Sequence, residues 1–139
     1  GGPVLPRRKS RRDEDALQIA FALWLNELGV LYTATCAGMR AHIRAAARMK
    51  AMGSKAGVPD ILIFEPTRRY HGLMIELKSS TGRPSVEQSA WRDSLNYKGY
   101  FAAIMPPNLD HDNGLVWLKD LVLDYLGRAK KRREDAEHI

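Results

Sequence analysis

Apolar residues recur at helical spacing near the start of the chain, which predicts an amphipathic helix. This helix is expected to begin near Asp13, a residue type suited to an N-cap, and to end at Gly29. Its apolar positions would form one buried face: Leu17, Phe21, Trp24, Leu25 and Leu28. Residues 30–35 then have the composition of a first strand.

Two apolar, β-branched runs over residues 60–64 and 73–78 predict a pair of antiparallel strands, because only a short loop joins them. Residues 36–56 before them are alanine-rich and are expected to be partly helical. Residues 85–88 have the S-x-x-Q form of a capping box and would open a helix to about residue 98. We expect this helix to bury Val86, Trp91 and Leu95.

Residues 100–105 form a short apolar run that predicts a strand parallel to 73–78, since a strand–helix–strand connection makes a right-handed crossover. Residues 115–126 are apolar, and their periodicity leaves open a strand followed by a helix or one helix. The pattern as a whole predicts one α/β domain over residues 13–127, with a small mixed sheet flanked by helices. Residues 1–12 are expected to be a disordered basic arm and residues 128–139 a charged tail.

Composition narrows the class of protein. A chain of 139 residues, 45% hydrophobic and 27% charged, suits a single modest core. No apolar run is long enough to cross a membrane. The single cysteine, Cys36, excludes an internal disulfide scaffold and suits a reducing compartment. With one cysteine and no metal-ligand spacing among the histidines, a zinc site is also excluded.

The distribution of positive charge points to a polyanion partner. The formal net charge is +6 and the pI about 9.7. Of 22 lysines and arginines, five fall in each of three acid-free stretches, at 7–12, 40–55 and 128–133. Nucleic acid is the natural partner of such stretches, although the two terminal ones would serve equally as solvated tails.

The central basic stretch contains the candidate nucleic-acid contacts. Arg40, Arg44 and Arg48 are four residues apart and would form one ridge of a helix. Phosphate contact is the favoured interpretation of this ridge over a merely solvated face. His42 suits a phosphate contact or a solvent position equally well. The remaining candidates are Lys50, Lys55 and Arg83.

Two carboxylates and a lysine interrupt the apolar runs. Glu76 and Lys78 are two residues apart, so on a strand their side chains point to the same face. If the two runs pair, Asp60 approaches Glu76, and the two carboxylates could hold a divalent cation beside Lys78. Taken alone, Glu76 and Lys78 would also suit the solvent face of an amphipathic strand.

Mg²⁺ or Mn²⁺ is the expected cation because both prefer oxygen ligands. Asp60, Glu76 and the backbone carbonyl of Leu77 would supply these oxygens. Such a cation can polarise a phosphate and activate water, while Lys78 adds a positive charge next to the phosphate. The predicted chemistry is therefore phosphodiester hydrolysis.

Several segments together resemble a known nuclease family. They are the E-x-x-x-Q of Glu14 and Gln18, M-G-x-K-x-G-V-P-D at 52–60, H-G-L-x-I-E-x-K at 71–78 and S-x-E-Q-x-x-W at 85–91. In this combination the chain resembles the PD-(D/E)XK superfamily and, more narrowly, its stand-alone phage-type VRR-Nuc (virus-type replication-repair nuclease) domains. The resemblance covers about residues 14 to 105.

The resemblance implies a restriction-endonuclease-like core of order α-β-β-β-α-β, with Asp60 and Glu76 as metal ligands and Lys78 as a catalytic residue. It also implies that Glu14 completes the metal site, through water, although Glu14 would equally favour the helix dipole. Asp13 or Asp15 could take its place. Gln88 would lie at the edge of the catalytic centre, a role compatible with the capping box.

By the same resemblance, the expected function is that of a Mg²⁺- or Mn²⁺-dependent, structure-selective DNA endonuclease. The expected form is a homodimer resembling a Holliday-junction resolvase, in the cytoplasm of a bacterial or phage-infected cell and associated with the nucleoid. A flap or fork nuclease of DNA repair or replication is the first alternative, and a sequence-reading restriction-type enzyme is less favoured. A non-catalytic DNA-binding module is the alternative from another class.

Overall fold

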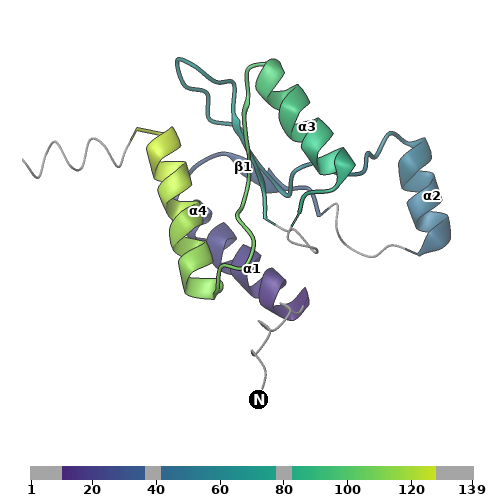
Figure 1. The fold of residues 1–139 in the computed structure, drawn as a ribbon, viewed down its shortest axis with the longest axis horizontal. Helices are drawn as coiled ribbons and strands as arrows, with labels where there is room; N and C mark the ends of the chain where they lie inside the picture. Colours follow the sequence, from purple (N-terminus) through teal and green to yellow (C-terminus); the bar gives the residue numbers. More distant parts are fainter. Residues whose placement is uncertain (1–10, 37–41, 78–82, 128–139) are drawn as a thin grey trace, which may run out of the picture.

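The fold is that of a computed structural model, which describes residues 11–36, 42–77 and 83–127. Four helices and four strands lie within these residues (Figure 1). In chain order they are α1 (Arg11–Leu28), β1 (Tyr32–Ala34), α2 (Ile43–Ala51), β2 (Ile61–Ile63), β3 (Leu73–Glu76), α3 (Val86–Tyr97), β4 (Phe101–Ile104) and α4 (His111–Tyr125).

The four strands form one mixed sheet in the order β1-β2-β3-β4. The pairs β1–β2 and β2–β3 are antiparallel, whereas β3 and β4 run parallel. The predicted antiparallel pairing of β2 with β3 and the predicted parallel pairing of β3 with β4 are therefore both confirmed. The helix that precedes β4 makes the crossover, as short connections require for parallel neighbours.

One face of the sheet carries the hydrophobic core. Ile61, Ile63, Leu73 and Ile75 are fully buried there because they occupy alternate positions on the two central strands. They pack with α1, which contributes three of the residues predicted for its buried face: Leu17, Phe21 and Leu25. Helices α1 and α4 pack against each other over this face (Figure 1).

Helix α3 lies on the other face and packs against β4. The side chain of Asn96 both accepts a hydrogen bond from the amide of Ala102 and donates one to its carbonyl. The expected burial of Val86 is wrong, because that side chain is 84% exposed. Val86 is the first residue of α3, whereas the hydrogen bonds to β4 come from Asn96 near the other end of the helix.

The ends of the helices differ from the predictions in two places. Helix α1 begins at Arg11, so Asp13 lies in its first turn and does not cap it. An acidic residue in the first turn still interacts favourably with the helix dipole. The predicted stop at Gly29 is confirmed, and its φ of 80° explains why glycine is suited there.

Helix α4 resolves the ambiguity of residues 115–126 in favour of one helix. Asp110 caps its start by accepting a hydrogen bond from the amide of Asn113. Its last residue, Tyr125, donates a hydrogen bond of 2.7 Å to the carbonyl of Glu65 in the loop between β2 and β3. No helix in the described part of the chain is long and apolar enough to span a membrane.

Helix α2 stands apart from the sheet, at the right of Figure 1. All of its residues are exposed, and its composition is alanine, basic residues and a few apolar ones. Its N-cap is His42, whose Nδ1 accepts a hydrogen bond of 3.3 Å from the amide of Arg44. A surface helix with no buried stripe is held mainly by the chain at its two ends.

Candidate active site

Asp60 and Glu76 lie at the same end of the two central strands. In the β2–β3 register Ile61 pairs with Ile75, so one residue further out Asp60 comes opposite Glu76. Because side chains alternate along a strand, both carboxylates belong to the face covered by α3 and not to the apolar core face. Asp60 is 6% exposed and Glu76 is 5% exposed, so this carboxylate pair is buried.

A backbone amide orients the carboxylate of Asp60. The N–H of Leu77 donates a buried hydrogen bond of 2.7 Å to Oδ2 of Asp60. The predicted approach of Asp60 to the strand that contains Glu76 is thus present in the structure. The predicted metal ligand at Leu77 is its backbone carbonyl. The backbone amide of the same residue bonds to the Asp60 carboxylate, so Leu77 contacts the site through this group as well.

Thr35 contacts the backbone of the same region from the other side. Its amide donates to the carbonyl of Asp60 at 2.9 Å, and its hydroxyl donates to the carbonyl of Pro59 at 2.9 Å. No pattern in the sequence marks Thr35 as part of a site. Only the pairing of β1 with β2 brings it next to Asp60, 25 residues further along the chain.

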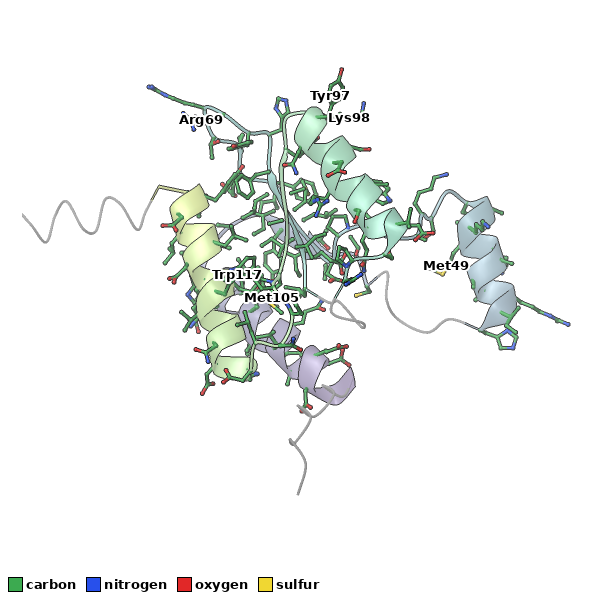
Figure 2. The ribbon with its side chains drawn as sticks, in the orientation of Figure 1. Met49, Arg69, Tyr97, Lys98, Met105 and Trp117 are labelled. Carbon is green, nitrogen blue, oxygen red and sulfur yellow. The ribbon has the colours of Figure 1, made fainter. Side chains whose placement is uncertain are left out.

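The start of α1 lies at this same end of the sheet. Met105 follows β4 and donates its amide hydrogen to the carbonyl of Glu76. In Figure 2, Met105 lies at the end of β4 that is opposite Lys98, so Glu76 is also at that end. A Cβ at Gly114, in the first turn of α4, would lie 3.2 Å from Leu17. Glu14 lies in the first turn of α1, one helical turn before Leu17.

The start of α3 packs against the segment that leads into Asp60. The capping box is present, with Gln88 Oε1 accepting from the amide of Ser85 and Ser85 Oγ accepting from that of Gln88. The indole of Trp91 donates a hydrogen bond of 3.0 Å to the carbonyl of Ala56. A Cβ on Gly57 would lie 2.5 Å from the backbone of Glu87, so the two segments are in direct contact.

The basic candidates fall into two groups. Arg44, Arg48 and Lys50 are exposed on α2, the helix set apart from the sheet (Figure 1). Lys55 and Arg83 are exposed near the start of α3, since Lys55 precedes Ala56 and Arg83 is two residues before the cap. Arg40 and Lys78 lie outside the described residues.

Comparison with known proteins identifies the family. The sequence matches the family described as the VRR-NUC domain over residues 8–106, the greater part of the chain. The chain belongs to the VRR-NUC family. A solved structure described as a "VRR_NUC domain protein" is 25% identical, with a TM-score of 0.55, over 78% of this chain and 86% of that one. No curated protein matches the sequence.

Membership confirms the resemblance drawn from the sequence and the predicted fold class. VRR-NUC domains are a nuclease-type family, so nucleic acid is the class of substrate to consider for this chain. The family match covers α1 to β4, including both Asp60 and Glu76, and ends before α4. The candidate site therefore lies within the part of the chain that is shared with the family.

The carboxylate pair of this VRR-NUC domain fits a divalent cation. Asp60 and Glu76 offer hard oxygen donors, and nucleases of the family generally use divalent metals. A cation would lower the cost of burying two carboxylates close together. In the described part of the chain no three His, Cys, Asp or Glu side chains are grouped to hold a metal. Two carboxylates supply hard oxygen ligands to such an ion and leave its other coordination positions to water or substrate.

Proposed function

We propose that this VRR-NUC domain is a divalent-metal-dependent endonuclease that cuts branched DNA. The observation that carries the proposal is the buried pair of Asp60 and Glu76 at one end of β2 and β3. Carboxylates on rigid neighbouring strands provide a preorganised site, and the Leu77 amide limits the rotation of one of them. A binding module has no need of two buried carboxylates at this position.

Each site residue has a proposed role. Asp60 and Glu76 hold the cation through their carboxylate oxygens, with the Leu77 carbonyl as a further ligand and Glu14 contributing through water. A bound Mg²⁺ or Mn²⁺ supplies Lewis acidity for phosphodiester hydrolysis. Lys78 places its ammonium beside the phosphate that is cleaved. Gln88, whose side-chain oxygen is engaged in the capping box, keeps its amide N–H groups for the edge of the site.

The exposed cations are proposed to hold the DNA backbone. Arg44, Arg48 and Lys50 on α2 would contact phosphates away from the site, together with Arg40 and the cap residue His42. Lys55 and Arg83 would contact phosphates closer to Asp60, because both adjoin the start of α3. Such contacts are independent of base sequence, so selection would come from the shape of the DNA.

A four-way junction is the proposed preferred substrate, cut by a homodimer. One carboxylate pair per chain suits the cleavage of one strand, and a two-fold dimer presents two symmetric sites to a symmetric junction. The separation of α2 from the sheet supports contact with a second DNA segment beyond the one being cut (Figure 1).

The test is a cleavage assay with Mg²⁺ or Mn²⁺ on labelled four-way junction, flap, fork and linear duplex of matched sequence. Paired, symmetric cuts in the junction support the proposal, and gel filtration or light scattering with the same samples measures the oligomeric state. Single cuts near the base of a flap would instead support the alternative function, a flap or fork nuclease. Intact DNA in every lane, with binding retained, would favour the non-catalytic module.

A further inference from the structure

Two consecutive backbone carbonyls around Asp60 accept hydrogen bonds from one residue, Thr35. The carbonyl of Pro59 belongs to the peptide group before the Asp60 Cα, and the carbonyl of Asp60 belongs to the peptide group after it. Both distances are 2.9 Å. Since each peptide group is planar, holding both of them sets φ and ψ of Asp60 and so the direction of its Cα–Cβ bond.

The side chain of Thr35 is needed there because the strand pairing is ending. The β1–β2 register pairs Ala34 with Ile61, and the next position brings Thr35 opposite Asp60. Pro59 has no N–H and cannot donate to a neighbouring strand. After Thr35 the chain turns away through Cys36, which has a φ of 54°. The Thr35 hydroxyl thus adds a cross-strand bond where backbone pairing stops.

We infer that Thr35 is a positioning residue for the metal ligand Asp60, an inference that rests on the proposed function. Thr35 sets the backbone of Asp60, and the amide of Leu77 then orients its carboxylate toward Glu76. A cation site that needs both carboxylates depends on this alignment. Thr35 acts on the backbone at Asp60, so its effect on a bound cation would pass through that ligand.

Three variants separate the hydroxyl of Thr35 from the bulk of its side chain. Thr35→Val keeps the shape and the backbone amide but loses the donor to Pro59. Thr35→Ser keeps the donor. Thr33→Val is the matched control, because Thr33 lies in β1 two residues before Thr35 but is exposed, and its hydroxyl donates to the carbonyl of the next residue, Ala34.

Two readouts are measured on the full chain. Binding of Mn²⁺ to the protein alone is followed by electron paramagnetic resonance or calorimetry, and cleavage of the four-way junction is followed as a function of Mn²⁺ concentration. We expect Thr35→Val to weaken Mn²⁺ binding and raise the half-saturating Mn²⁺ concentration by about tenfold, the low end for groups that support metal ligands. Thr35→Ser and Thr33→Val should stay within about twofold of wild type, and DNA binding in chelator should not change.

Equal Mn²⁺ affinity in wild type and Thr35→Val would overturn the inference, as would an equal loss in Thr33→Val. If the valine variant does not fold, as judged by circular dichroism, Thr35→Ala replaces it in the same comparison. Failure of the proposed function would look different, because wild type would then leave the four-way junction uncut. In that case the Mn²⁺ titrations of wild type and variants still decide whether Thr35 positions Asp60.

Discussion

The amide of Leu77 donates a 2.7 Å hydrogen bond to Oδ2 of Asp60, across 17 positions of sequence. The bond is buried, and it joins the start of β2 to the end of β3. Asp60 is therefore part of the sheet's hydrogen bonding as well as a candidate metal ligand. Substitutions at Asp60 must keep an acceptor at this position if they are to report on charge alone.

Asp60→Asn is the substitution that meets this requirement. The amide side chain retains an oxygen that can accept from Leu77, but it loses the negative charge that holds a cation. We expect junction cleavage to fall at least about a hundredfold, since a catalytic metal supplies several kcal/mol, while DNA binding persists. Asp93→Asn is the control, because Asp93 is 72% exposed and pairs with Arg92. Full activity of Asp60→Asn would contradict the proposed site.

The double variant Arg44→Ala/Arg48→Ala tests helix α2 as a DNA contact. If each arginine neutralises one phosphate, the slope of log K against log salt should become shallower by about 2. Affinity should fall more for the junction than for linear duplex, as measured by fluorescence anisotropy, because α2 is proposed to contact a second DNA segment. Arg68→Ala/Arg69→Ala is the matched control, since this exposed pair lies in the loop between β2 and β3, at the end of these strands away from Asp60 and Glu76; Figure 2 labels Arg69. The same change of slope in both double variants would count against a specific role of α2.

Gly57→Ala should destabilise the protein more than Gly53→Ala. Both glycines have positive φ, 83° and 107°, so alanine at either position is strained, at a cost of about 1 kcal/mol. A Cβ at Gly57 would also lie 2.5 Å from the backbone of Glu87, whereas nothing lies within 4 Å at Gly53. We expect a loss of about 3 kcal/mol for Gly57→Ala in urea unfolding. Equal losses would mean that α3 does not pack closely on this segment.

Tyr125 gives an expectation for alkaline pH. Burial raises its pKa above the usual 10.0, the nearby Glu65 and Tyr70 raise it further, and a hydrogen bond with Thr67 acts in the opposite direction. The folded state thus favours the neutral phenol. The resulting contribution to stability is fully present below the unfolded pKa of about 10, and it is lost as pH rises through the higher folded pKa.

Tyr125→Phe should show the consequence of this shift. It removes the hydrogen bond to the Glu65 carbonyl, at a cost of about 1 kcal/mol near neutral pH. Its free energy of unfolding should then decline less than that of wild type above pH 10. Tyr97→Phe serves as the control, because Tyr97 is 91% exposed and its removal should change neither quantity. An unchanged alkaline decline in Tyr125→Phe would contradict the expected shift.

Much of the fold was predictable because its determinants are local. The apolar spacing in α1, the stop at Gly29, the capping box at Ser85 and the strand pairs all appear in the structure as expected. The burial predicted for Val86 is wrong because burial depends on what packs over each side chain. Glu87 and Gln88 in the same turn lie against Gly57, but the Val86 side chain is exposed. The sequence suits His42 equally to a phosphate contact or a solvent position, and only the structure shows its Nδ1 as the N-cap acceptor of α2.

The sequence by itself determined the elements, the alternation that puts Asp60 and Glu76 among apolar residues, and the family to which the chain belongs. The elements and the alternation follow from periodicity and composition, which act over a few residues, whereas the family follows from the combined motifs and the match over residues 8–106. Only the tertiary structure decided that Thr35 holds the backbone of Asp60, that Trp91 bonds to Ala56 and that α2 stands apart from the sheet. Those contacts depend on strand register and helix placement, which join residues far apart in the chain and leave no local pattern.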